Sequence, residues 1–224
     1  MKTILKIVVF MISLPLIGSI LIKPHTTVHD ASKNDISVIN SKFHVVIHEE
    51  RGDFCYTPEE IVEWMTVAQI PKDIVFSESE DYVEISSQSS YDSEQEYLKA
   101  LTTVLRTDLV FAWEREGCPE KLDFDRTGLC IKYPRSDNMD KGEYIKRKKA
   151  KSAAEATKGV VITKEKKVIA APFFTSSESS MLIAQAGDGV GFSLNYAYRL
   201  AKDGKDFYKI LQFFYNGISV EIYE

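Results

Sequence analysis

The glycine-rich stretch at residues 187–191 is the clearest candidate for a ligand-binding loop in the chain. Its alternating glycines, Gly187, Gly189 and Gly191, let the backbone bend sharply and let another molecule approach it closely. Apolar residues at helical spacing follow, so the loop is predicted to open a helix whose free N–H groups favour a polar or anionic ligand. The pattern is also typical of a simple turn, and Ser193 can equally be the cap of that helix.

A second group of polar residues lies along the helix predicted over residues 94–116, which has the strongest helical pattern in the chain and ends at Gly117. The group consists of Lys99, Thr102, Thr103 and Arg106. Cations on such a stripe can bind a ligand, but most polar stripes on helices are only solvated faces. The pattern alone therefore favours a solvated stripe.

The N-terminal segment, residues 1–22, is predicted to reach a membrane. Two lysines precede an uncharged run that starts at residue 7, and Lys23 closes it. The run is short for a spanning helix, although residues 3–5 can extend it if Lys6 reaches back to the interface. No small-residue cleavage site precedes Lys23, so we favour an uncleaved anchor over a removed signal peptide. In both cases the rest of the chain is expected outside the cytoplasm.

Three cysteines are an odd number for an exported chain. Cys118 and Cys130 lie in one short loop region and are a candidate disulfide, which would leave Cys55 free. Spacing alone does not establish the pairing, and unpaired thiols stay open as the alternative.

The chain beyond the anchor mixes helical and strand patterns without a βαβ rhythm, which predicts an α+β fold. Residues 23–42 are typical of a linker, and residues 42–48 of a half-buried strand. Thr57 is a predicted N-cap with Pro58 at the first helical position, and this helix should end before Pro71. Further predicted elements are a solvated insertion at 77–94 around a strand at 82–85, a basic helix at 140–157, a hairpin of 159–162 and 168–174, a helix at 207–214 and a strand at 218–222.

Composition and charge limit the classes of function. The chain has 224 residues and a net charge of -5, which argues against a general nucleic-acid-binding protein and against a purely electrostatic membrane anchor. The basic run at residues 146–149 is interpreted as a solvated face. We predict one extracytoplasmic domain at residues 57–224, a linker and first strand at 23–56, and the anchor at 1–22.

Four blocks of residues occur in a characteristic order. They are Glu59-Glu60-Ile61-Val62 through Val67-Ala68-Gln69-Ile70-Pro71, Glu96-Tyr97-Leu98-Lys99-Ala100 through Arg106-Thr107, Ala156-Thr157-Lys158-Gly159 through Ser176-Ser177, and the glycine ending from Gly187 to Gly217. In this order the blocks resemble the stage II sporulation protein D family, which includes the amidase-enhancer domains. The resemblance covers about residues 57–223.

This resemblance implies work on peptidoglycan outside the membrane, typically while a forespore is engulfed. Active members of the family are lytic transglycosylases that cleave glycan strands stripped of stem peptides, and one glutamate acts first as acid and then as base. The implied partners are glycan strands and other cell-wall hydrolases of a sporulation complex. No cofactor and no nucleic-acid partner are expected. The implied substrate-binding residues are Lys99, Arg106, Ser176, Ser177, Gly189, Gly191 and Ser193.

The chain departs from the family pattern at the catalytic position, where Gln69 replaces the glutamate. A glutamine side chain has no ionisable proton and cannot alternate between acid and base. The loop histidine is replaced by Asp188, and the serine turn contains Glu178. Some members hold zinc with two cysteines and two histidines after the Arg-Thr helix, but this chain has no histidine there, so we predict no metal.

Three interpretations follow from the sequence. The favoured one is a divergent, catalytically weak or inactive member that binds peptidoglycan or a partner enzyme. The second is an active lytic transglycosylase with a displaced carboxylate. The third is an unrelated membrane-anchored α+β protein. For single residues, Arg106 stays open between a glycan contact and a salt bridge on the helix surface, and Lys99 is more often solvated than a ligand. A membrane location with one N-terminal anchor is expected, with secretion as the alternative.

Overall fold

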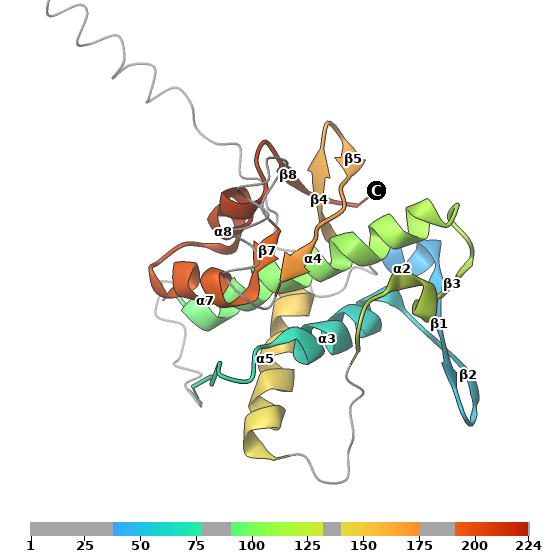
Figure 1. Cartoon of the computed structure of the whole chain (residues 1–224), viewed down its shortest axis with the longest axis horizontal. Coiled ribbons are helices and arrows are strands. Elements are labelled where there is room, and N and C mark those ends of the chain that lie inside the picture. The colour runs from blue at the N-terminus through green and yellow to red at the C-terminus, as the bar shows by residue number, and fades with distance from the viewer. Residues whose placement is uncertain (1–37, 78–90, 132–139, 175–190, 224) are drawn as a thin grey trace, which may run out of the picture.

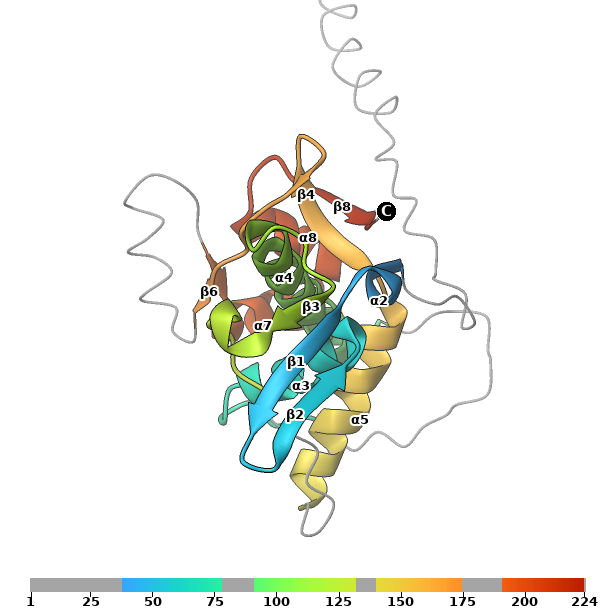
Figure 2. The ribbon, with the colours of Figure 1, turned by 90° about the vertical axis from the view of Figure 1, so that its right-hand side faces the viewer.

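The computed structural model describes residues 38–77, 91–131, 140–174 and 191–223. Helices and small sheets alternate along these residues, which confirms the mixed α+β class. Helix α4 (Ser93–Arg115) runs through the middle, and α3, α5, α7, α8 and β4 all pack against it (Figures 1 and 2). Its apolar side chains form the centre of the core, and Leu98, Leu101, Leu105 and Leu109 are completely buried.

Helix α3 (Pro58–Gln69) begins where the sequence predicts. The Thr57 side chain accepts a hydrogen bond from the Glu60 N–H, and the Glu60 carboxylate accepts one from the Thr57 N–H at 2.8 Å. This reciprocal capping box, with a proline at the first position, satisfies two N–H groups that the helix itself leaves unpaired. The helix ends at Gln69, immediately before the extended residue Ile70 and Pro71, as predicted.

Helices α4 and α5 also match their predicted positions. The Asp92 side chain caps the start of α4, and Gly117 follows its end with φ +84°, a left-handed conformation that suits glycine. Helix α5 (Lys141–Ala156) starts after the cap residue Asp140, is followed by its C-cap Thr157 and packs on α3 and α4. The basic run on α5 is less solvated than predicted, because Arg147 and the Lys149 side chain are largely buried.

The first sheet contains residues that precede residue 57 in the sequence. Strand β1 (His44–Glu49) pairs antiparallel with β2 (Gly52–Tyr56) and parallel with β3 (Lys121–Asp123), which continues into the short 3-10 helix η1 (Phe124–Thr127). Helix α2 (Val38–Lys42) precedes β1.

Residues of α2 and β1 belong to the same core as α4. Ile39, Val45 and Ile47 are buried, and the Phe43 ring stacks on Trp113 with 4.7 Å between ring centroids. Residues 38–56 therefore pack into the same core as the domain predicted to begin at residue 57. Residues 38–42, expected as linker, form a helix because Ile39 has an apolar place in this core.

The second sheet has the order β5-β4-β8 and is antiparallel. Strands β4 (Val160–Lys164) and β5 (Lys167–Val168) form the predicted hairpin, and β8 (Ser219–Ile222) is the predicted last strand. The second hairpin strand was expected to continue to Phe174, which is wrong. Beyond Val168 the Ala171 N–H donates to the Asp108 carboxylate on α4 at 2.7 Å, so the chain leaves β4.

The C-terminal elements pack over α4. Strand β6 (Phe173–Phe174) pairs parallel with β7 (Phe192–Ser193), and helices α7 (Leu194–Lys202) and α8 (Phe207–Phe214) follow. Gly204, with φ +83°, ends the α7 region as predicted. Within the described ranges, no helix is both long enough and apolar enough to cross a membrane. The predicted anchor at 1–22 and the predicted strand at 82–85 lie outside the described residues.

Candidate functional site

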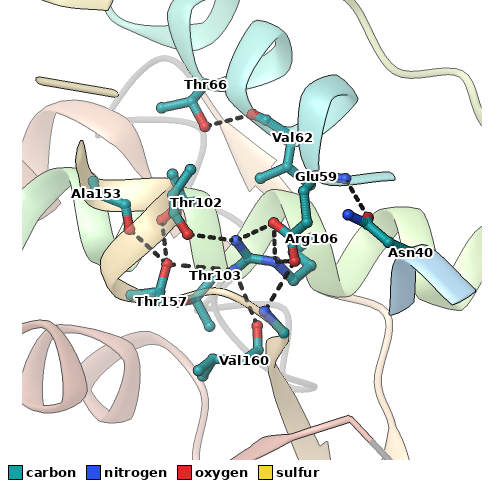
Figure 3. Close-up of polar contacts among 12 residues, drawn as sticks. Asn40, Glu59, Val62, Thr66, Thr102, Thr103, Arg106, Ala153, Thr157 and Val160 are labelled. Atoms are coloured by element: carbon teal, nitrogen blue, oxygen red, sulfur yellow. Dashed lines mark hydrogen bonds and ion pairs between the residues drawn. The ribbon is translucent and has the colours of Figure 1, made fainter. Parts of the chain in front are cut away.

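A buried ion pair joins the helices that carry the predicted site. Arg106 on α4 has no exposed surface, and its Nη2 lies 2.8 Å from Oε2 of Glu59 on α3 (Figure 3). The Arg106 Nε also donates to both oxygens of that carboxylate at 3.1 Å. The remaining guanidinium hydrogens reach the carbonyls of Val160 and Ala154 and the hydroxyl of Thr157, at 3.2, 3.3 and 3.4 Å. A buried guanidinium is tolerated because its five N–H groups all have acceptors.

Glu59 connects further segments. Its carboxylate oxygen Oε1 accepts the Gly159 N–H at 2.9 Å. Its backbone N–H donates to the Asn40 side-chain oxygen on α2 at 3.2 Å (Figure 3). Two hydroxyl groups complete the network, since Oγ1 of Thr102 and Oγ1 of Thr157 form a hydrogen bond at 3.0 Å. Three of the blocks that resemble the family, around residues 59, 106 and 157–159, therefore meet at one point.

This geometry answers the question that the sequence left open for Arg106. The side chain forms a salt bridge, but a buried one that holds α3, α4 and α5 together, and it does not reach solvent where a glycan could bind. Thr102 and Thr103 are also completely buried. The interpretation of this stripe as a solvated face is thus wrong except at Lys99, because α3, α5 and β4 cover it.

Lys99 keeps part of its side chain exposed, 27% of its surface. Its ammonium group pairs with Glu96 at 2.9 Å and lies 6.0 Å from the centre of the Phe207 ring. The other Glu96 oxygen accepts the Phe207 N–H at 2.7 Å, at the start of α8. Lys99 can still offer a cation at the surface, but it also helps to attach α8 to α4.

Two further predicted site residues have structural roles. Ser193 is completely buried and caps α7 by accepting the Tyr196 N–H, which agrees with the capping alternative. Gly191 is required by packing, because a Cβ there would lie 2.1 Å from a carbon of the Phe174 ring and 2.8 Å from the Pro172 carbonyl oxygen. Ser176, Ser177 and Gly189 lie outside the described residues, so their predicted role is untested.

Gln69 is the last residue of α3 and is half-buried. Within the described part of the chain, no hydrogen bond or ion pair joins its side chain to Lys99, Arg106 or Ser193. Gln69 therefore lies outside the hydrogen-bond network of Glu59 and Arg106. Among the predicted site residues that the structure describes, only Gln69 and Lys99 have partly exposed side chains that could contact a ligand.

Among the described residues, two carboxyl groups, those of Asp108 and Glu63, have a raised pKa and can exchange a proton, which the Gln69 amide cannot. Burial raises the pKa of Asp108 to about 6, and the hydrogen bond from the Ala171 N–H offsets this only in part. Burial also raises the pKa of Glu63 on α3, although Lys151 and Arg147 counteract the shift. The Asp108 carboxylate has no ion pair among the described residues, and its hydrogen-bond donor, Ala171, lies two residues before β6.

Glu94 forms a second buried centre that sequence reasoning missed. It lies in the first turn of α4 and accepts hydrogen bonds from the Ser77 N–H at 3.1 and 3.2 Å. The ammonium group of Lys149 on α5 also donates to it, and that of Lys202 on α7 lies 3.6 Å away. Glu94 therefore ties three helices and the segment after α3 together. An acidic residue in a first helical turn is ordinary, so the sequence carries no signal for this role.

Cysteine and histidine positions give no metal centre in the described ranges, where no three potential ligands cluster. Cys55, Cys118 and Cys130 are all free and exposed, so the predicted disulfide between Cys118 and Cys130 is not formed in this structure. Cys118 is held at the end of α4 in a left-handed conformation, where its N–H donates to the Trp113 carbonyl at 3.0 Å. His48 is an exposed residue that pairs with Asp53 at 2.7 Å, and this hydrogen bond raises the pKa of His48.

Comparison of the sequence with models of protein families and with curated proteins finds no match to either. The resemblance to the stage II sporulation protein D family therefore rests on the residue blocks described above.

Proposed function

We propose that the protein is an extracytoplasmic cell-wall protein of the stage II sporulation protein D type, which binds peptidoglycan glycan strands without cleaving them efficiently. Its proposed setting is the outer face of the cell membrane, held there by the segment at residues 1–22. Glycan strands and other cell-wall hydrolases of sporulation are its proposed partners.

The proposed loss of catalysis is supported by Gln69. It occupies the final position of α3, where the resemblance places the glutamate, and α3 is fixed in place by its capping box and by the Glu59–Arg106 pair. An amide at this position retains the size of the acid but cannot exchange a proton with a glycosidic oxygen.

The contacts of Glu59 support the relationship that underlies the proposal. The blocks around residues 59, 106 and 157–159 are far apart in the sequence, yet the Glu59 carboxylate accepts hydrogen bonds from both Arg106 and Gly159. If the order of these blocks reflects a shared fold, residues from different blocks should contact each other. The observed convergence therefore favours a common scaffold over a coincidental order of motifs.

Sedimentation with purified sacculi tests the binding role. We expect the full-length chain to pellet with sacculi, and the variant Lys99→Gln to pellet less, because Lys99 is the partly exposed cation among the predicted ligands. Lys166→Gln, on the exposed turn between β4 and β5, is the matched control and should pellet like the unchanged chain. A chain that stays in solution contradicts the proposal.

A second candidate function is an active lytic transglycosylase, and Asp108 is the observation that favours it. Its pKa of about 6 lets the carboxyl group both donate and accept a proton near neutral pH. Release of anhydro ends from denuded glycan strands by the unchanged chain, abolished in Asp108→Asn, would support this function over the first.

A further inference from the structure

His48 lies between two carboxylates that come from different strands. Its Nδ1 is 2.7 Å from Oδ1 of Asp53 on β2, and its Nε2 is 3.6 Å from Oδ1 of Asp123 at the end of β3. His48 itself belongs to β1, which is the middle strand of the sheet, because the strand order is β2-β1-β3. One imidazole ring therefore bridges all three strands.

The two contacts of His48 favour the protonated ring. An ionised carboxylate only accepts hydrogen bonds, whereas a neutral imidazole has one N–H group and one acceptor nitrogen. The neutral ring can therefore donate to only one of the two aspartates, and its unprotonated nitrogen repels the other. The imidazolium form donates from both nitrogens and also attracts both negative charges.

Asp123 joins β3 to the short 3-10 helix that follows it. Its Oδ1 caps η1 by accepting the Asp125 N–H at 3.0 Å, and Nε of Arg126 lies 3.5 Å from its Oδ2. Strand β3 pairs with β1 over only three residues, from Lys121 to Asp123. Because so short a strand has few backbone contacts, a side-chain contact at its end contributes a large part of its attachment.

Other charged groups around His48 have smaller effects. Asp125 adds negative charge from η1, and Arg126 partly neutralises Asp123. Helix α3 also contacts β1, but on the opposite face, which carries the buried Val45. The remaining charged residues of β1, its turn and β3 are two acidic and two basic ones, which balance each other: Glu49, Glu50, Arg51 and Lys121.

We propose that His48 is a proton-dependent link between the β1–β2 hairpin and the end of β3. As an imidazolium it holds both aspartates, and on deprotonation it releases Asp123 and keeps the shorter bond to Asp53. The hydrogen bond and the charge of Asp53, and then the charges of Asp123 and Asp125, raise the pKa of His48 above its ordinary value of 6.5. The attachment is therefore fully present below about pH 6.5 and is lost as pH rises through the pKa of the folded chain.

The link controls a local opening of β3 and η1, not the unfolding of the whole chain. The His48 side chain is 46% exposed, and an exposed ion pair changes an equilibrium by about 1.5- to 5-fold. Because exposed charges are screened by salt, the link should weaken at high ionic strength. The inference does not depend on glycan binding.

An NMR titration of His48 in the full-length chain tests the two contacts. We expect Asp53→Asn and Asp123→Asn each to lower the pKa of His48, because each removes a negative charge beside one ring nitrogen. Glu221→Gln, at an exposed position of β8 in the second sheet, removes the same charge elsewhere and should leave this pKa unchanged. A His48 pKa that does not respond to Asp123→Asn would overturn the proposal.

Hydrogen exchange of the Phe124 and Asp125 amides measures the attachment itself. We expect His48→Gln to speed this exchange about two- to fivefold at pH 5.5, and much less at pH 8.5, where the unchanged chain has also lost the contact. His44→Gln, at another exposed position of β1, is the matched control and should have no effect at either pH. With 0.5 M NaCl the difference at pH 5.5 should shrink. An effect of His48→Gln that is equal at both pH values, or absent at both, would contradict a proton-dependent link.

Discussion

Arg106 and Glu59 stand 47 positions apart in the sequence and form a buried pair in which the guanidinium group has no exposed surface. The pair lies where α3, α4 and the turn before β4 meet, so it fixes the position of the helix that ends at Gln69. Arg106, which the family resemblance suggests as a substrate-binding residue, is thus a buried residue that positions α3.

Glu59→Gln should strongly destabilise the protein. The amide still fills the space, but it leaves the buried Arg106 charge uncompensated, and breaking a buried pair costs about 3–5 kcal/mol. Urea unfolding at pH 7 measures the change in free energy of unfolding. Glu155→Gln removes an exposed carboxylate of α5 and should change it by less than about 0.5 kcal/mol. Equal stability of both variants would contradict the structural role of the pair.

Gly191→Ala should destabilise the protein by about 1–3 kcal/mol, because the added methyl group overlaps the Phe174 ring and approaches the Pro172 carbonyl. Part of the loss should be recovered in Gly191→Ala/Phe174→Leu, which removes the ring but not the backbone contact. Gly142→Ala in α5 is the control, since only the Asp140 side chain comes within 3.3 Å of the new atom. Thermal unfolding of the three variants checks the order.

The stability of the protein should depend on pH through Asp108. Its pKa is 3.8 in an unfolded chain and about 6 in the fold, so between these values the folded chain holds a proton that the unfolded chain has lost. The contribution of Asp108 to the free energy of unfolding therefore falls as pH rises from about 4 to 7, by about 3 kcal/mol in total.

Asp108→Asn isolates this effect, because its amide oxygen can still accept the Ala171 N–H without carrying charge. We expect the variant to gain stability over the unchanged chain as pH rises from 4 to 7, and to keep a constant advantage above pH 7. Urea unfolding at several pH values measures the difference. A difference that does not vary with pH would mean that Asp108 titrates normally.

Gln69→Glu should restore a carboxylate at the end of α3 with little effect on stability, since the position is half-buried and the side chains are nearly equal in size. We expect the variant to release anhydro ends from denuded glycan at a measurable rate, because a general acid contributes about 10²–10⁴-fold. Gln212→Glu, at an exposed position of α8, should release none. No gain in Gln69→Glu would indicate that other parts of the catalytic site are also lost.

The three cysteines should all react in the folded protein. Cys55, Cys118 and Cys130 are exposed and free in the structure, so a thiol reagent should modify three groups per chain without denaturant. The pairing of Cys118 with Cys130 predicts only one. Mass spectrometry of the labelled protein, prepared without reductant, decides between the two.

Local features of the fold could be predicted from the sequence, because their causes lie within a few residues. The cap at Thr57, the end of α3 before Pro71 and the hairpin of β4 and β5 all follow from short-range stereochemistry. The parallel pairing of β6 with β7 could not be predicted, because each strand has only two residues and the segment before β6 is held by a hydrogen bond between Asp108 and Ala171, 63 positions apart.

The candidate site was harder to predict for the same reason. A charged residue on a helix indicates a solvated position or a ligand contact unless its buried partner is known. The partners of Arg106, Lys149 and Glu94 come from other helices. The sequence pattern therefore assigned Arg106 to the surface or to a ligand, while the fold uses it as an internal support.

The partners of Glu59 also constrain the order in which the chain can fold. One partner lies 47 positions downstream and another 100, so α3 cannot complete its buried contacts until the turn at Gly159 has been synthesised. We expect a nascent chain that ends at residue 156 to leave the amides of α3 open to hydrogen exchange. During synthesis, the carboxylate of Glu59 in the first turn of α3 therefore lacks its partners Arg106 and Gly159 until both have been made. At this stage folding factors and proteases can act on the incomplete chain.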